Sequence, residues 1–158
     1  MTDASLDEVD RAILRALQED ARHHTNAEIS ERVDVSASTV GKRIAALEEQ
    51  GVIKGYRTEI DYDKAGYPLL VLFICTAPIT DRERLVRETL GLDGVVNVRE
   101  LMTGVNNAHI LVTGTANDDI TRIAHQIDEL GFNVSDEILL RNEYNEPSVH
   151  FEPDVANE

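Results

Sequence analysis

A polar turn between two capped helical patterns constrains the fold of this chain more than any other feature. Thr25 and Glu28 have the spacing of a capping box, in which each side chain satisfies a free backbone amide at a helix start. The first pattern stops at residues 34–36, where Ser36 can cap a second helix. Apolar side chains recur at helical spacing through both patterns, namely Ala27, Ile29, Val33, Val40, Ile44 and Leu47. The sequence therefore predicts two short helices that cross at a tight turn.

The exposed face of the second predicted helix is polar and partly cationic near its start. It carries Ser36, Ser38, Thr39, Lys42 and Arg43. In helix-turn-helix proteins the early residues of the second helix reach base edges and phosphates in the major groove of DNA. An earlier amphipathic pattern, with a predicted capping box at residues 5–8, supplies a third helix and closes a small core. A polar stripe also occurs on ordinary surface helices, but the three patterns together favour a DNA-binding unit.

The second half of the chain changes from helical to alternating patterns. The predicted strands span residues 69–77, 95–102, 109–115 and 134–144. One predicted helix begins at a third capping box, residues 80–83, and another begins at Asn117. This order is that of a ferredoxin-like βαββαβ domain, with an antiparallel sheet and both helices on one face. The fold class is therefore α+β, with an N-terminal three-helix, winged helix-turn-helix and a C-terminal βαββαβ domain.

The first predicted strand is apolar on both of its faces. One set of alternating residues is Leu69, Val71, Phe73 and Cys75, and the other is Leu70, Leu72 and Ile74. A strand with one solvated face would alternate with polar residues. Since the two helices cover only one face of the sheet, we expect the other face to pack against a second copy of the chain. Burial by the hinge of the same chain is the alternative.

The charge of the chain is strongly negative but unevenly distributed. The net charge is −15, yet residues 1–57 hold 11 acids and 8 bases, whereas residues 58–158 hold 19 acids and 7 bases. A local cationic surface on the helical unit is therefore compatible with an acidic chain. Because only three of the fifteen cations are lysine, the composition resembles that of proteins from salt-loaded cytoplasms, and a halophilic archaeon is the predicted source.

The cysteine, the histidines and the apolar runs indicate in which cellular compartment the protein works and whether it binds a metal. The single cysteine, Cys75, excludes an intrachain disulfide and fits a reducing cytoplasm. The start of the chain has no basic leader, and the apolar run at 69–74 is too short to span a bilayer. The histidines lack metal-site spacing. We therefore expect a cytoplasmic protein without membrane contact, cofactor or metal.

Residues spread over nearly the whole chain resemble the Lrp/AsnC feast-or-famine family of regulators. They are Leu6-Asp7, Asp10, Ile13-Leu14, Leu17, Asp20, Arg22, Ser36, Ser38-Thr39-Val40, Arg43, Ile44, Leu47-Glu48, the run from Gly51 to Tyr56, and Thr103-Gly104. The resemblance implies transcription regulators that form dimers, and often tetramers or octamers, through a ligand-sensing βαββαβ domain and commonly bind amino acids. It divides the chain into a DNA-binding domain at 1–57, a hinge at 58–67, a sensing and oligomerisation domain at 68–146 and a tail at 147–158.

The same resemblance implies two sets of binding residues. Ser36, Ser38, Thr39, Lys42 and Arg43 would contact double-stranded DNA, and Thr103, Gly104, Asn106 and Asn107 would line an effector loop, with His109 on the strand beside it. Members of the family usually carry an aspartate soon after the glycine, where it accepts hydrogen bonds from a ligand ammonium. This chain has asparagine there, a weaker partner for a cation. The alternative interpretation of Asn106-Asn107 is a simple hairpin turn.

Two further functions have some support. Sirohaem decarboxylases are built on a similar chain, and Arg99, His109 and Arg141 are the residues that could serve such an enzyme. The other possibility is an architectural protein that recognises DNA shape. The leading prediction is a sequence-specific regulator, not an enzyme, whose affinity or assembly responds to a small molecule.

Overall fold

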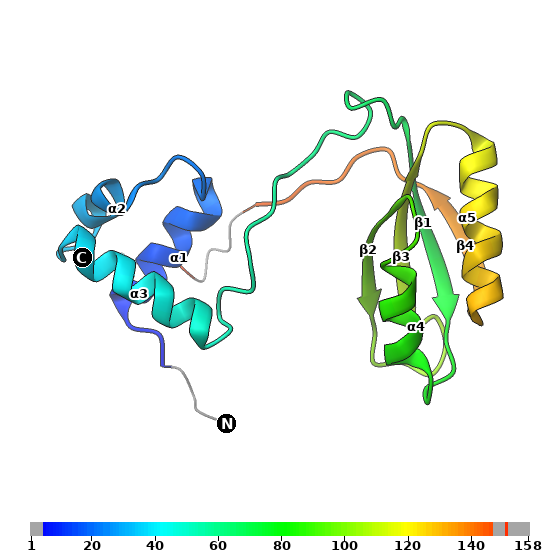
Figure 1. Ribbon diagram of the computed structural model, residues 1–158, viewed down its shortest axis with the longest axis horizontal. Coiled ribbons are helices and arrows are strands. Elements are labelled where there is room, and N and C mark those ends of the chain that lie inside the picture. Colours follow the sequence, from blue (N-terminus) through cyan, green and yellow to red (C-terminus); the bar gives the residue numbers. More distant parts are fainter. Residues whose placement is uncertain (1–4, 147–150, 152–158) are drawn as a thin grey trace, which may run out of the picture. The chain divides into compact units, whose positions relative to one another are not determined.

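The computed structural model describes residues 5–146 and residue 151, and the chain forms two compact units. The helical unit comprises the described residues up to Thr58, with 144–146 and Phe151, and the sheet unit comprises Glu59–Glu143 (Figure 1). The predicted α+β fold class is confirmed. Of the predicted tail, 147–158, only Phe151 is described, and it packs against the core of the helical unit.

Three helices form the helical unit: α1 (Glu8–Asp20), α2 (Asn26–Arg32) and α3 (Ala37–Glu49). Their apolar stripes meet in one core, in which the fully buried side chains include Ile13, Ile29 and Val40. Burial of these stripes is the main stabilisation of such short helices, because helices of this length are marginal in isolation.

The caps at the helix starts differ in part from the prediction. Thr25 and Glu28 form the predicted box at α2, since the Glu28 amide donates to Thr25 Oγ1 (3.2 Å) and the Thr25 amide to Glu28 Oε2 (2.8 Å). The predicted box at residues 5–8 is wrong. Asp7 is the N-cap of α1 and pairs with Asp10, and Leu6 consequently packs against the core.

The sheet unit has the predicted βαββαβ order. Its elements are β1 (Leu69–Thr76), α4 (Arg82–Thr89), β2 (Val95–Glu100), β3 (Ala108–Gly114), α5 (Asn117–Leu130) and β4 (Asn133–Leu139). The strands form an antiparallel sheet in the order β2-β3-β1-β4. Both helices pack on one face, where Leu85, Ile123 and Ile127 join Phe73 and Ile110 in the core.

The predicted end of the last strand and one predicted helix cap in the sheet unit are wrong. The last strand ends at Leu139 instead of 144, because its partner β1 begins at Leu69 and the chain beyond Leu140 has no strand to pair with. The third predicted capping box is also absent. The Asp81 amide bonds to the Pro78 carbonyl in a turn, and Asp81 precedes α4 with helical backbone angles and without a side-chain cap bond.

The second face of the sheet, called here the outer face, carries the other alternating set of residues. Leu70, Leu72 and Ile74 of β1 lie on it and are half-buried, whereas their neighbours Val71, Phe73 and Cys75 are buried under the helices. Cross-strand partners point to the same side, so the register adds Leu111 of β3 and Ile138 of β4, both opposite Leu72. The predicted doubly apolar strand is therefore present, with one face covered by helices.

Gly94, which precedes β2, is the glycine whose replacement should cost most. Its φ is +95°, and an added Cβ would lie 2.6 Å from Ile123 Cδ1 and 2.9 Å from the Thr113 carbonyl oxygen. We expect Gly94→Ala to lower the free energy of unfolding by about 2–4 kcal/mol, from backbone strain and overpacking together. Gly66→Ala, with a similar φ of +92° but open space, should cost only about 1 kcal/mol. Equal losses of stability in urea titrations of the two variants would contradict this assignment.

Candidate DNA-reading and effector sites

The candidate DNA-reading helix, α3, presents Ser38 and Lys42 to solvent. They lie four residues apart, hence on one helix face, and both are exposed. Ser36 caps the helix by accepting from the Thr39 amide (3.2 Å), and the two hydroxyl oxygens lie 2.9 Å apart. Four of the five predicted DNA contacts therefore cluster at the start of α3, with Lys42 as the exposed cation among them.

Arg43, the fifth predicted contact, turns toward α1. Its Nη1 lies 2.6 Å from Asp7 Oδ2 and 3.2 Å from Asp10 Oδ1. The hydrogen bonds that the Asp7 carboxylate accepts from the Asp10 amide and from Arg43 hold its pKa below the usual value. Arg43 therefore joins the start of α1 to the middle of α3 and fixes the angle between these helices.

Gly41 of α3 lies close to the start of α2. A Cβ at this position would lie 3.0 Å from Asn26 Nδ2, so a side chain on α3 would push against the start of α2. Gly41 is half-buried in the interior of a helix, where glycine is less favourable than alanine by about 1 kcal/mol. The limited space beside the Asn26 side chain favours glycine at this position.

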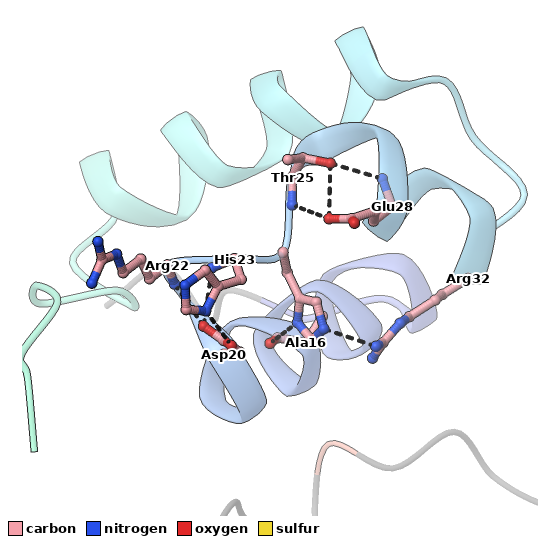
Figure 2. A network of polar contacts seen from close by, with 8 residues as sticks. Ala16, Asp20, Arg22, His23, Thr25, Glu28 and Arg32 are labelled. Atoms are coloured by element: carbon pink, nitrogen blue, oxygen red, sulfur yellow. Dashed lines mark hydrogen bonds and ion pairs between the residues drawn. The ribbon is translucent and has the colours of Figure 1, made fainter.

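A network of polar contacts fixes the turn between α1 and α2 (Figure 2). His24 Nδ1 lies 2.8 Å from the Ala16 carbonyl oxygen, and its Nε2 lies 3.0 Å from Arg32 Nη2. A guanidinium only donates hydrogen bonds, so in this arrangement His24 Nε2 accepts from Arg32 and Nδ1 donates to the Ala16 carbonyl. Glu19 accepts from Arg32 at 2.7 Å. No local sequence pattern predicts this network, because the fold of the turn brings its members together.

The predicted effector residues fall into three environments. Thr103, Gly104 and Asn106 are exposed on the loop between β2 and β3. Asn107 is fully buried, and His109 is half-buried on β3, opposite Arg99 and Ile74. The structure thus exposes Thr103, Gly104 and Asn106 on the loop, buries Asn107 at the end of the same loop and places His109 on β3.

Asn107 joins the loop to the end of β1. Its Oδ1 accepts from the Ala77 amide (2.8 Å) and its Nδ2 donates to the Ala77 carbonyl (2.9 Å). Both functions of the amide are thereby satisfied inside the protein. Asn107 holds the loop in place and has no free polar atom directed at the solvent side.

Asn106 has the left-handed backbone, with φ of 51°, that the hairpin interpretation expects. The backbone amide of Asn106 donates to Thr76 Oγ1, and its side-chain Oδ1 accepts from Ser135 Oγ, each at 2.8 Å. Thr103 Oγ1 donates to the Val105 carbonyl at 2.5 Å. These bonds shape an ordered loop whose polar side chains remain exposed.

Arg82, at the start of α4, is a residue of this region that the sequence analysis missed. Its Nη1 donates to the Leu101 carbonyl (3.1 Å), and its Nε lies 2.6 Å from Glu100 Oε1 in an ion pair. Arg82 therefore fastens the base of the loop, as Asn107 fastens its end. Arg82 precedes Leu101 by 19 residues in the sequence, so no local sequence pattern predicts this contact.

The described residues were also compared with the requirements of a reactive thiol, a metal site and a membrane-spanning helix. Burial raises the pKa of the Cys75 thiol to about 12, which leaves it protonated and unreactive. No group of three or more His, Cys, Asp or Glu within 5–146 is placed to hold a metal ion. None of the helices in the described part of the chain is long and apolar enough to cross a membrane.

A three-helix unit whose capped α3 presents a polar face to solvent, followed by a βαββαβ unit, is the architecture of a helix-turn-helix regulator with a separate C-terminal domain. The family described as "Winged helix-turn-helix DNA-binding" matches residues 6–54. An uncharacterised HTH-type transcriptional regulator of Pyrococcus horikoshii is 41% identical over 108 residues, covering 68% of this chain and 67% of that protein. The regulator LrpA1 of Halobacterium salinarum is 34% identical over 136 residues, covering 85% and 87%. The chain belongs to the Lrp/AsnC family of transcriptional regulators.

Solved structures support the same fold. A transcriptional regulator from Neisseria meningitidis, solved as its L-Met complex, has a TM-score of 0.73 at 21% identity and covers 91% of this chain and 95% of that one. At this identity the likeness concerns the fold.

Asn107→Asp tests the structural role of the buried amide. A carboxylate can still accept from the Ala77 amide, but it faces the Ala77 carbonyl without a proton to donate. We expect a loss of about 2–4 kcal/mol of unfolding free energy at pH 7, from a buried unpaired acceptor that also carries charge. The loss should shrink as pH falls, because a protonated carboxyl can donate to that carbonyl.

Asn106→Asp is the matched control, since the same change on the exposed neighbour keeps the acceptor used by Ser135. Urea titrations at several pH values should show little effect of this control. Equal stability of the two variants at pH 7 would refute the role assigned to Asn107.

Proposed function

We propose that this chain is a cytoplasmic, sequence-specific DNA-binding regulator that acts as a homodimer and responds to a small molecule, with amino acids as the effector class. The observation that carries the DNA-binding part is α3, which presents Ser38 and Lys42 to solvent while its apolar side is buried. Small hydroxyls and a lysine on one face suit contacts with phosphates and base edges.

The surface charge near α3 supports the same proposal. Lys42, Lys54 and Arg57 are exposed in the helical unit, whereas Glu48 accepts a hydrogen bond from Tyr56 at 2.8 Å. Local cations can therefore contact phosphates even though the whole chain is acidic. Arg43 acts in this proposal as a positioning residue, because its guanidinium is engaged by Asp7 and Asp10.

Homodimerisation is supported by the outer face of the sheet. Leu72 lies between Leu111 and Ile138 on neighbouring strands, and Ile138 is 41% exposed. A continuous apolar surface of this kind is costly in water and marks a protein–protein contact. A second copy of the chain brings the same apolar surface and completes a two-layer packing of sheets.

The loop between β2 and β3 is the proposed effector site. Thr103, Asn106 and the backbone at Gly104 supply polar groups there. Hydrogen bonds of Asn107 and Arg82 hold the loop in place. Met102 and Val105 on the same loop are 99% and 69% exposed, which suits assembly of dimers into tetramers or octamers around this loop. The L-Met complex of the Neisseria relative supports an amino acid as ligand.

The proposal is non-enzymatic. Of the three residues that could serve a sirohaem decarboxylase, Arg99 and His109 are neighbours on the outer face, and Arg99 pairs with Glu143 at 3.4 Å. These positions belong to the surface proposed for dimerisation. An architectural role is less favoured, because the acidic charge of the chain opposes binding that rests on phosphates alone.

Lys42→Ala tests the DNA-reading face. We expect the affinity for a duplex selected by the parent protein to fall about tenfold, as the loss of one groove or phosphate contact predicts. Fluorescence anisotropy with the labelled duplex measures the change. Lys64→Ala removes another exposed lysine, one paired with Asp61 outside the helical unit, and should leave affinity unchanged. Equal effects of the two substitutions would point to non-specific charge instead.

The same titration, repeated with each of the twenty amino acids, tests the effector. The proposal expects at least one amino acid to change the affinity or the assembly state, because a ligand shifts an equilibrium only through different affinities for its states. If none changes either property, the effector part of the proposal fails while the DNA-binding part stands.

A further inference from the structure

A groove opens between α5 and the edge strand β4, which lie side by side in the sheet unit (Figure 1). Its volume is about 620 Å³, within the range of about 300–1,000 Å³ that small-molecule sites occupy. The apolar part of its lining includes the buried Phe73 and Phe132 and the half-buried Val134. None of the lining residues belongs to the loop between β2 and β3, so the α5–β4 groove is separate from the proposed effector site.

The polar side chains that line the groove include two carboxylates and no lysine or arginine. Asp128 of α5 supplies one carboxylate and Glu137 of β4 the other. Glu137 lies on the helix side of the sheet because it is the register partner of Phe73. The other polar side chains are those of His125 and Asn133. Each wall of the groove therefore contributes one acid.

Neither carboxylate is neutralised by the described part of the chain. Among the described residues, no side chain forms a hydrogen bond or ion pair with the carboxylate of Asp128 or Glu137. The arginines of α4 and α5 pair with other acids, namely Arg82 with Glu100, Arg84 with Glu88, Arg87 with Glu83 and Arg122 with Asp119. The groove thus keeps two negative charges beside an apolar surface.

The end of α5 adds to this negative potential. The helix ends at Leu130, and the next residue, Gly131, lines the groove. The carbonyl groups at a helix C-terminus carry partial negative charge, which lysine or arginine in the last turn offsets favourably. The last turn of α5 holds no basic residue and carries Asp128 and Glu129 instead. A cation bound in the groove would supply the missing positive charge.

We propose that the α5–β4 groove binds an aliphatic diamine or polyamine, with ammonium groups at Asp128 and Glu137 and the methylene chain against the apolar lining. Two carboxylates match two ammonium groups in charge, and methylene groups gain by leaving water at the surface of Phe73 and Phe132. This site is an addition to the proposed function and does not depend on it.

Other cations and amino acids suit the groove less well. The α-carboxylate of a free amino acid would bring a third negative charge to a lining that has no lysine or arginine. Divalent metal ions such as Mg²⁺ and Ca²⁺ prefer about six or more oxygen ligands, whereas no group of three or more His, Cys, Asp or Glu among the described residues is placed to hold a metal. The chemistry of the groove therefore favours an organic cation without a carboxylate.

Equilibrium dialysis of the whole chain against labelled putrescine and spermidine, a short diamine and a longer triamine, tests the site. In about 0.1 M KCl we expect at least one of them to bind at one molecule per subunit, and about 1 M KCl should weaken the binding by screening. Butylamine, with a single ammonium group, should compete only at a concentration roughly tenfold or more higher, since it lacks one hydrogen bond between charged groups. Butanediol, which is uncharged, should not compete.

Variants locate the bound amine. Asp128→Asn and Glu137→Gln should each weaken binding roughly tenfold, because each removes one charged partner. Glu129→Gln is the matched control, since it removes the same charge from the next position of α5, outside the lining of the groove. It should change the affinity by less than about twofold. All three side chains are exposed, so we expect the variants to fold, and circular dichroism checks this.

Two results would overturn the proposal. If neither amine binds, the groove is not an amine site. If all three variants weaken binding equally, or if several amines bind each subunit, the amines follow the overall negative charge of the chain and the groove has no special part. Both results leave the proposed DNA-binding and effector functions untouched, because those rest on other residues.

Discussion

The four-stranded sheet has two faces, and the two helices of the sheet unit, α4 and α5, cover one of them. Val71, Phe73 and Cys75 are buried under α4 and α5, whereas Leu70, Leu72 and Ile74 lie half-buried on the outer face. Apolar area contributes to stability only when it leaves water, at about 25 cal/mol per Å². In the proposed homodimer, a second copy covers the outer face and so couples folding of the sheet to assembly. Two copies also supply two α3 helices, which is the arrangement that recognition of paired half-sites requires.

A few polar contacts around a small core set the orientation of the three helices in the helical unit. Asp7 and Asp10 cap α1 and at the same time hold Arg43 of α3. Gly41 lets α2 approach α3, and the His24 and Arg32 contacts fix the turn that leads into α2. These interactions orient α3 so that Ser38 and Lys42 remain exposed. In the proposed function, the positioning of α3 and the contact with DNA thus fall to different residues of the same helix.

Local patterns predict much of this structure, and long-range contacts account for the rest. The Thr25–Glu28 box, the helical stripes and the βαββαβ order follow from spacing within a few residues. The partner of Arg43 lies 36 residues away, and the Ala77 backbone bound by Asn107 lies 30 residues away. No local pattern distinguishes a buried asparagine in such a loop from an exposed one. At the start of α1 the cap is Asp7 instead of the predicted Ser5, and Leu6 packs against the core.

Selection of bound sequences from a random duplex pool, by the purified chain in potassium chloride, tests the central claim most directly. A dimeric reader predicts enrichment of a motif with two inverted half-sites whose centres are about 10 base pairs, or a multiple of that spacing, apart. A pool that remains unenriched, or that yields a single half-site without symmetry, would contradict the account of a dimer that presents two copies of α3 to DNA.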